Sequence, residues 1–251
     1  MNQKSLIKKA SRLALFFESY ILPVLYLISI CQLISYIWER RSSLGQVWEH
    51  VLRDPNDINH ILFLSLIVAK FFFIILYFLT ALGLIVRRNL KVEPEDWLEI
   101  IVPLVGTFFY LFYQLIPYLP DRYNAYILPA QIFYPAILIG TLLNIIGFII
   151  AGTALYNLMY SMSIFIQVRD LVTGGLYTFV RHPIYLGYII SHVGIGLIQP
   201  RPGYIILSLF LIAITVYRAR LEEKKLLYHC PEYKEYARKT PFLFPNRLFN
   251  R

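Results

Sequence analysis

One polar stretch organises this chain: Gly174-Gly175-Leu176-Tyr177-Thr178-Phe179-Val180-Arg181-His182-Pro183-Ile184-Tyr185-Leu186-Gly187. Apolar segments lie on both sides of it, so we expect it at a membrane surface. Its glycine pair permits a turn with positive φ. His182 precedes a proline and is pushed out of helical conformation, whereas Pro183 suits the first position of a helix. The stretch therefore predicts a loop that ends with Arg181 and His182 at the N-terminus of a helix.

The composition is that of an integral membrane protein. The chain has 251 residues, of which 58% are hydrophobic and 16% charged, whereas a soluble domain carries about 25% charged residues. We expect no cleavable signal, because the first residues are polar and basic and the first apolar run is long enough to span. Cys31 and Cys230 lie in an apolar segment and a basic tail without ligand spacing. Neither a disulfide nor a metal site is predicted.

Six apolar segments are candidates for spanning helices, since a span needs about 20 mostly apolar residues. They are residues 13–38, 58–86, 97–119, 135–156, 183–199 and 203–217. The last two are joined by Gln199-Pro200-Arg201-Pro202, whose prolines cannot continue a helix, so a tight helical hairpin is predicted. Residues 158–168 are expected to lie partly buried at the membrane surface. The predicted fold class is all-α integral membrane, with about six transmembrane helices in one membrane domain.

The basic residues predict the side on which each loop lies. One side of the six spans carries most of them: Lys4, Lys8, Lys9, Arg12, Arg87, Arg88, Lys91, Arg169, Arg181, Arg218, Arg220, Lys224, Lys225, Lys234, Arg238, Lys239, Arg247 and Arg251. The other side carries Arg40, Arg41, Arg53, Arg122 and Arg201. This bias predicts a multi-pass protein with both termini and the polar stretch on the cytosolic side. The net charge of +9 is therefore attributed to topology and anionic lipid rather than to nucleic acid.

One lysine, Lys70, lies within the second apolar segment. A charge inside a membrane is expensive and often functional, but a snorkelling or paired lysine explains it equally well. Glu18 and Glu99 are candidate partners, and the sequence does not choose between them.

A second charged cluster follows the hairpin, where Arg218 and Glu222 share one helix face. They form either a simple ion pair or, with Glu223, a site that accepts ribose hydroxyls or an ammonium group. Because the hairpin is short, its two ends meet, and His182 is predicted to face the same pocket as Glu222. Residues 221–239 have a helical pattern, which fits either a solvated helix or a lid over that pocket.

The polar stretch admits two interpretations by itself. A helix N-terminus attracts a carboxylate or phosphate, and Tyr177 and Tyr185 add aromatic faces for a base or a cation. An interfacial belt of tyrosine and arginine in contact with lipid head groups explains the same residues.

Together the two clusters resemble the signature of the isoprenylcysteine carboxyl methyltransferase and phospholipid methyltransferase superfamily. The matching segments are Leu171 to Tyr177, Arg181 to Gly187, Arg218 to Glu223, Tyr233 to Tyr236, and Pro241 to Pro245. They fall within residues 137–245, and the first 130 residues carry no such match. Two positions depart from the pattern: Arg169, where prenylcysteine enzymes commonly have His, and Cys230, where the tail often has Phe.

The resemblance implies methyl transfer from S-adenosylmethionine (AdoMet) to a membrane-embedded acceptor. It implies a cofactor pocket lined by Leu171, Val172, Tyr177, His182, Pro183, Ile184, Tyr185, Glu222 and Glu223. It also implies that Arg218 faces the acceptor, with residues 1–130 as N-terminal helices of unassigned role and 131–251 as the methyltransferase core and lid. A carboxylate acceptor is ionised at neutral pH and would be held by Arg218. An amine or thiol would have to lose a proton, with His182 or the two glutamates as candidate bases.

Two other function classes stay open. Membrane sterol and steroid reductases resemble the hairpin and use a His-Pro-x-Tyr-x-Gly element with NADPH, but they usually carry Asn and an acid where this chain has Ile184 and Tyr188. A non-catalytic lipid-binding membrane protein is the third reading. We favour transfer to the carboxylate of a prenylcysteine-like substrate, with lipophilic or lipidated molecules and membrane lipids as partners, in a plasma, inner or endoplasmic reticulum membrane. The sequence leaves the acceptor, the membrane and the oligomeric state open.

Overall fold

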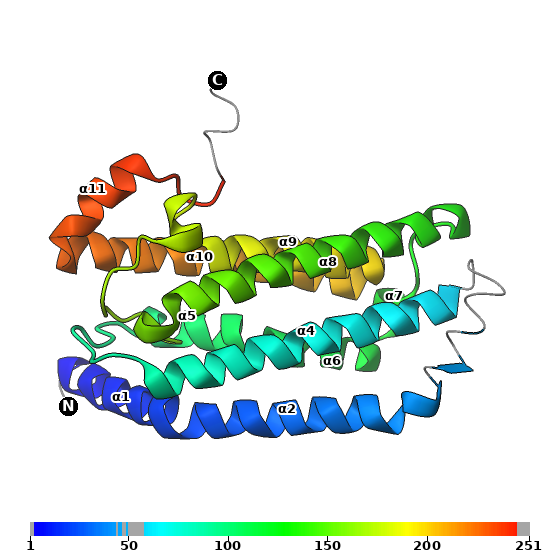
Figure 1. Ribbon diagram of the computed structural model, residues 1–251, viewed down its shortest axis with the longest axis horizontal. Coiled ribbons are helices and arrows are strands. Elements are labelled where there is room, and N and C mark those ends of the chain that lie inside the picture. The colour runs from blue at the N-terminus through cyan, green and yellow to red at the C-terminus, as the bar shows by residue number, and fades with distance from the viewer. Residues whose placement is uncertain (1–2, 44, 47–48, 50–57, 245–251) are drawn as a thin grey trace.

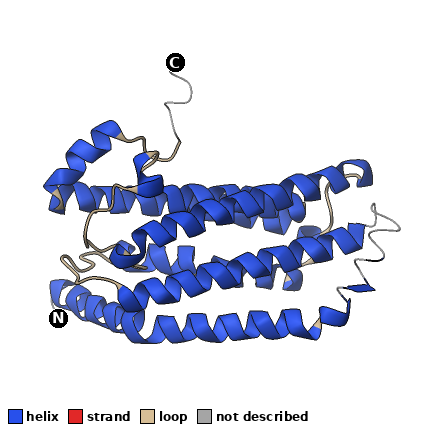
Figure 2. Cartoon of the chain, in the orientation of Figure 1, coloured by secondary structure: helices blue, strands red, loops and turns tan. Residues whose placement is uncertain are grey.

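The computed structural model describes residues 3–43, 45–46, 49 and 58–244, and these are mostly helical (Figures 1 and 2). Among them there is no strand, and one isolated antiparallel bridge joins Val92 to Val168. The long helices lie side by side along the long axis of the molecule (Figure 1). The all-α membrane fold predicted from the apolar segments is confirmed. Of the basic and proline positions discussed above, Arg53, Pro245, Arg247 and Arg251 lie outside the described residues.

The elements follow the apolar pattern of the sequence. The first half contains α1 (Gln3–Phe16), the π-helical turn η1 (Phe17–Ile21), α2 (Leu22–Glu39), α4 (Ile58–Val86), α5 (Leu98–Thr107), α6 (Phe109–Leu115), η2 (Ile116–Tyr118) and α7 (Asp121–Asn124). The second half contains α8 (Ala130–Leu158), η3 (Met159–Ser161), η4 (Gly175–Thr178), α9 (Pro183–Ile198), α10 (Pro202–His229) and α11 (Pro231–Lys239). The last three helices each begin with proline, whose fixed φ and missing N–H suit that position.

Among the described residues, four helical segments are long and apolar enough to cross a membrane: Ser5–Glu39, His60–Val86, Ile132–Ser161 and Pro202–His229. A fifth candidate is a broken one, because Leu98–Thr107 and Phe112–Tyr118 meet at 60°. The backbone leaves helical geometry there, at Phe108. The sixth predicted segment, α9, has 16 residues and is apolar but shorter than the others. Six apolar segments are thus present, of which four or five are long enough to span.

Two helices extend beyond the predicted membrane spans. The fourth helix begins at Ala130 and contains Pro135, rather than starting after that proline. A proline inside a membrane helix is tolerated because neighbouring groups satisfy the freed carbonyl. The sixth helix continues from Tyr217 to His229 as part of α10, because its charged end pairs with the rest of the protein instead of leaving the bundle. The helical pattern predicted for residues 221–239 is confirmed by the end of α10 and by α11, which begins at Pro231.

Glycines allow α8 and α9 to pack in close backbone contact. A Cβ added at Gly147 would lie 2.5 Å from the carbonyl oxygen of Gly187, and one at Gly140 would lie 2.7 Å from that of Gly194. Small residues let membrane helices approach in this way. This contact fixes α9 against α8 and thereby fixes His182 at the start of α9.

The connection from η3 to η4 is more deeply buried than the sequence suggested. Its buried side chains are Met162, Ile164, Phe165, Ile166, Val168 and Arg169. The loop after α4 and the start of α5 cover it: Lys91 N–H donates to the Val168 carbonyl at 2.9 Å, and Ile166 N–H donates to the carbonyl of Glu99 on α5 at 3.1 Å. This 162–172 segment is therefore clamped between the two halves of the chain.

Glu18 and Glu99, the acids considered as partners of Lys70, form ion pairs with other residues. Glu18 pairs with Arg87 Nη1 at 2.8 Å and Glu99 with Lys225 Nζ at 2.5 Å, while Lys70 Nζ lies 3.9 Å from the centre of the Tyr36 ring.

The predicted cytosolic elements gather at one end. The N-terminal end of the described chain, α11 and the loop before α9 all lie at the same end of the helices (Figure 1). Their assignment to the cytosol stays a prediction, as does the division at residues 130 and 131.

Candidate functional site

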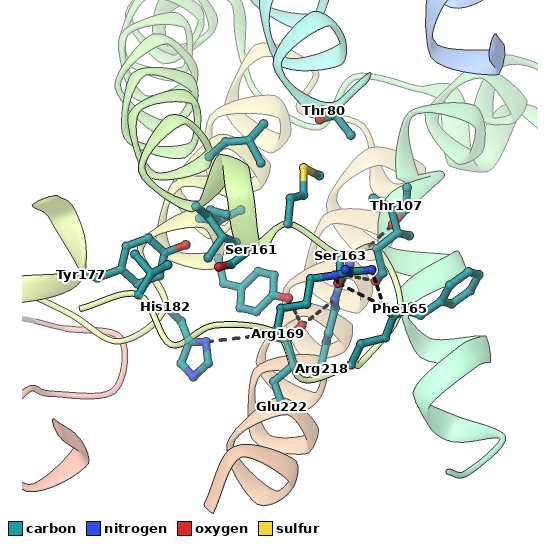
Figure 3. Close-up of a pocket in the computed structure, with 18 of the residues that line it drawn as sticks. Thr80, Thr107, Ser161, Ser163, Phe165, Arg169, Tyr177, His182, Arg218 and Glu222 are labelled. Atoms are coloured by element: carbon teal, nitrogen blue, oxygen red, sulfur yellow. Dashed lines mark hydrogen bonds and ion pairs between the residues drawn. The ribbon is translucent and has the colours of Figure 1, made fainter. Parts of the chain in front are cut away.

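A cavity lies where the 162–172 segment, α9 and α10 meet the N-terminal helices (Figure 3). Polar residues line one part of it: Asp170, Tyr177, Arg181, His182, Glu222, Tyr233 and Tyr236. Apolar and aromatic residues line another: Tyr26, Phe73, Leu76, Tyr77, Leu155 and Met162. Thr80 lies across the cavity from His182 and Glu222 (Figure 3). The cavity is thus polar where it meets α11 and apolar where it meets α2 and α4.

The structure brings most of the predicted site residues together. Eight line the cavity: Leu171, Val172, Tyr177, His182, Ile184, Tyr185, Arg218 and Glu222. Pro183 and Glu223 are not among the lining residues. Pro183 is buried at the first position of α9, and Glu223 pairs with Arg181 Nε at 3.0 Å. These two therefore support the wall rather than form it.

His182 lies at the N-cap of α9 with the non-helical angles φ −126° and ψ 62°, and the following proline disfavours the helical conformation at this position. Its Nδ1 lies 4.0 Å from a carboxylate oxygen of Glu222, and its Nε2 lies 3.5 Å from one of Glu223. The ring stacks on Tyr185 and meets Phe242 edge-on. His182 and Glu222 do lie against one pocket, as the short hairpin predicted.

Arg218 is buried on α10, and its guanidinium is held from three directions. Nε donates to Glu222 at 3.3 Å, Nη2 to the Ile164 carbonyl at 2.6 Å, and Nη1 approaches the Thr107 hydroxyl at 3.5 Å. Glu222 also accepts a hydrogen bond from the Tyr185 hydroxyl. A buried charge is stable only when it is paired in this manner. The result is a fixed cation at the side of the cavity (Figure 3).

Helix α11 and the residues after it cover the polar part of the cavity. The Tyr233 hydroxyl donates to Glu223 at 3.0 Å, and the Tyr236 hydroxyl donates to the Tyr177 carbonyl at 2.7 Å. The backbone N–H of Arg181 donates to the Pro241 carbonyl at 2.9 Å. Burial raises the pKa of Tyr236 to about 12, so this phenol stays protonated and remains a donor at neutral pH.

Several lining residues were not identified from the sequence as part of the site. They are Tyr26, Phe73, Leu76, Tyr77, Thr80, Thr107, Ser161, Ser163, Gln167 and Asp170. Most come from ordinary apolar helices with no motif, so only the fold places them here. Asp170 could have been found from the sequence, because it follows Arg169, where the chain departs from the family pattern. Hydrogen bonds from Lys91 and Arg88 hold the pKa of the Asp170 carboxyl below its usual value.

Arg169, where the resembling enzymes commonly have His, is buried and lines the cavity. It donates to the Ser163 hydroxyl at 2.8 Å, to Gln167 at 3.2 Å and to the Arg88 carbonyl. Burial, with a smaller contribution from Arg87, lowers the pKa of Arg169 to about 10, so it stays charged at neutral pH. Its role here is to hold the 162–172 segment together.

Metal-ligating side chains do not cluster in the part of the chain that the structure describes: no group of three His, Cys, Asp or Glu residues there could hold an ion. Cys31 and Cys230 are both free thiols.

Comparison with known protein families finds a match in the region that supplies the charged residues lining this cavity. The model of the phospholipid methyltransferase family matches residues 135–230, which include His182, Arg218 and Glu222. The match, which covers less than half of the chain, connects this region with the integral membrane methyltransferases. The group includes the phospholipid and isoprenylcysteine carboxyl enzymes, so the resemblance found from the motifs is confirmed. The methyltransferase region covers almost all of α8 and the whole of α9 and α10, and α1 to α7 precede it.

Two curated proteins resemble a shorter part of the chain. The cobalt-zinc-cadmium resistance protein CzcN of Cupriavidus metallidurans is 34% identical over 78 residues, which is 31% of this chain and 36% of that protein. The nickel-cobalt-cadmium resistance protein NccN of Alcaligenes xylosoxydans xylosoxydans is 35% identical over 77 residues, which is 30% of this chain and 36% of that protein. The chain thus spans about a third of the length of these relatives.

Proposed function

We propose that this protein is a membrane enzyme that transfers a methyl group from AdoMet to the carboxylate of a lipophilic, prenylcysteine-like acceptor. The single observation that carries the proposal is the position of Arg218. Its paired guanidinium borders one cavity that is polar toward α11 and apolar toward α2 and α4. The methyltransferase region that contains it supplies the class of reaction.

The polar part of the cavity fits AdoMet by the chemistry of its side chains. Tyr177, Tyr185 and Tyr236 offer aromatic faces for an adenine ring or a sulfonium cation. Glu222 offers a carboxylate for ribose hydroxyls or for the cation. His182 lines the cavity with its ring between Glu222 and Glu223, at 4.0 Å and 3.5 Å, so its imidazole adds a polar group to this part of the cavity. AdoMet, when bound, supplies an already activated methyl group, so the protein mainly provides proximity and alignment.

The apolar part of the cavity fits a hydrophobic acceptor. Phe73 and Leu76 from α4 and Tyr26 from α2 are almost fully buried and face this space. An acceptor carboxylate is ionised at neutral pH and needs no base. Arg218 would bind it through charge-assisted hydrogen bonds, which are roughly twice as strong as neutral ones.

An amine or thiol acceptor would need a general base, which a carboxylate acceptor does not. The group would have to lose a proton, and His182 or Glu222 would have to take it. The two-electron reduction by NADPH considered from the sequence is disfavoured, because residues 135–230 match a methyltransferase model.

Calorimetry on the purified protein tests the cofactor. We expect AdoMet to bind and NADPH not to bind, with affinity for AdoMet reduced in Glu222→Ala and His182→Ala. Glu235→Gln is a matched control, because Glu235 is exposed and pairs only with Lys239 on the outer side of α11 in the contacts described. Binding of NADPH alone, or of neither compound, would contradict the proposal.

We also propose that the site end of the molecule faces the cytosol, because the basic loops gather there. The cysteine of Glu235→Cys, in a background with Cys31 and Cys230 replaced by serine, should react with an impermeant maleimide in inside-out vesicles. Labelling only in right-side-out vesicles would reverse the orientation.

A further inference from the structure

The N-terminal helices contain a buried acid that reaches the site. Glu18 lies on the π-helical turn between α1 and α2 and has no exposed surface. Its Oε1 accepts the backbone N–H groups of Ile164 at 2.5 Å and Phe165 at 3.3 Å. Its Oε2 accepts from Gln167 Nε2 at 2.8 Å. Each carboxylate oxygen of Glu18 is therefore bonded to the 162–172 segment.

This arrangement holds the Glu18 carboxylate in one orientation. An isolated carboxylate is very costly to bury, and it persists only when it is paired and hydrogen-bonded. Arg87 supplies the charge, with Nη1 at 2.8 Å from Oε2, while its Nη2 donates to the hydroxyl of neighbouring Ser19 at 2.8 Å. Short π-helical turns are frequent at functional sites.

One peptide unit joins Glu18 to Arg218. The N–H of Phe165 donates to Glu18, and the carbonyl of Ile164, which belongs to the same planar peptide, accepts Arg218 Nη2 at 2.6 Å. Because the peptide is planar, fixing its N–H fixes the direction of its carbonyl. Figure 3 shows Phe165 and Arg218 on the same side of the cavity.

We propose that Glu18 is a positioning residue for Arg218. It orients the Ile164–Phe165 peptide, and that peptide sets the guanidinium against the acceptor end of the cavity. This inference rests on the proposed function for the role of Arg218, and it gives the helices outside the methyltransferase region a part in the reaction.

The activity test separates acceptor binding from cofactor binding. With N-acetyl-S-farnesylcysteine as the acceptor probe, Glu18→Ala should raise the acceptor KM about tenfold, as expected for the loss of one well-placed hydrogen bond to a charged group. The calorimetric AdoMet affinity should stay within about twofold of the parent value, since Glu18 does not line the cavity. Glu18→Gln keeps an oxygen that can accept from Ile164 and Phe165, so it should lie between the parent and Glu18→Ala.

Glu99→Gln is the matched control. It also removes a carboxylate partner of a buried cation, the 2.5 Å contact of the partly buried Glu99 with Lys225, and it keeps the backbone carbonyl that accepts Ile166. It should lower stability without changing the acceptor KM. An equal rise of KM in Glu99→Gln and Glu18→Gln would show a general loss of stability and would overturn the proposal.

A second test needs no activity. Arg218 should react slowly with phenylglyoxal in the parent protein, because its guanidinium is buried and bonded. Glu18→Ala, or Glu18→Gln if the former does not fold, should speed that modification about fivefold or more, as expected for local opening. Amide hydrogen exchange in residues 162–170 should accelerate with it. Unchanged modification and exchange would overturn the proposal, even if the enzyme methylates no probe and the proposed function fails.

Discussion

The two halves of this chain differ in how their contribution to the site can be recognised. Residues 135–230 carry motifs and match a family model, and they supply His182, Arg218 and Glu222. The helices before them carry no such match, yet Phe73 and Leu76 line the same cavity and Glu18 bonds to its rim. A motif thus identifies the polar groups of a membrane site, whereas the apolar walls come from helices that any membrane protein could have.

The largest expected effect lies in the motif-bearing half. Arg218→Ala should reduce methyl transfer about 100-fold, because loss of one partner of a buried charge pair costs about 3 kcal/mol. AdoMet affinity should be nearly unchanged, since the proposed function assigns Arg218 to the acceptor and not to the cofactor. Steady-state kinetics with calorimetry on the same preparation checks both. A parallel loss of AdoMet binding would show that Arg218 belongs to the cofactor site instead.

Gly187 lies in the motif, but we expect it to serve the packing of α8 against α9 and not the binding of the cofactor. A Cβ there would lie 2.5 Å from the Gly147 carbonyl oxygen and 2.7 Å from the Ala151 nitrogen, so α8 and α9 would have to separate. Gly187→Ala should cost about 2 kcal/mol of stability, as overpacking does. Thermal denaturation in detergent should show a lower melting temperature with or without AdoMet. Gly174→Ala is the control, because a Cβ at Gly174 meets nothing within 4 Å.

Leu76 tests the motif-free half. Leu76→Trp adds volume at a nearly fully buried position of the apolar wall. It should raise the acceptor KM roughly tenfold, because a change of about one methylene in a hydrophobic pocket is already worth about 1–3 kcal/mol of substrate binding, and it should spare AdoMet affinity. Ile85→Trp, at an exposed position on the same helix, is the control. If Leu76→Trp weakened AdoMet binding instead, the assignment of the two parts of the cavity would be reversed.

The smallest expected effect concerns the cover over the polar end. Tyr236→Phe removes the hydrogen bond to the Tyr177 carbonyl and keeps the ring. AdoMet affinity should fall about fivefold, the equivalent of about 1 kcal/mol for one neutral hydrogen bond. Calorimetry measures it, and Tyr228→Phe, an exposed tyrosine on α10, should bind like the parent. No change in Tyr236→Phe would mean that α11 does not restrain the cofactor.

The sequence predicted the parts of the fold that depend on local chemistry. Pro183 and the proline-containing turn before α10 fixed a hairpin, and the hairpin brought His182 to Glu222. Helix α10 continues past the predicted span into the protein because Lys225 is buried by pairing with Glu99, a contact between residues 126 apart in sequence that the sequence could not supply.

The sequence could not supply contacts that depend on helix packing. Glu18 was considered as a partner for Lys70, but it pairs with Arg87 and with backbone groups of the 162–172 segment. Because every residue except proline carries a backbone N–H, residue types do not reveal which backbone groups will bond to a side chain such as Glu18. The lining of the cavity by Tyr26 and Leu76 was equally unpredictable, because a lipid-facing and a cavity-facing apolar residue have the same chemistry.

The fate of the methyl group tests the central claim most directly. AdoMet with a deuterated methyl group and N-acetyl-S-farnesylcysteine should give a labelled ester, detected by mass spectrometry and released by mild base, in the parent and not in Arg218→Ala. The corresponding probe with its carboxylate already esterified should remain unlabelled. Label that resists base, label on phosphatidylethanolamine or a long-chain thiol in place of the carboxylate probe, or no transfer at all would contradict the account.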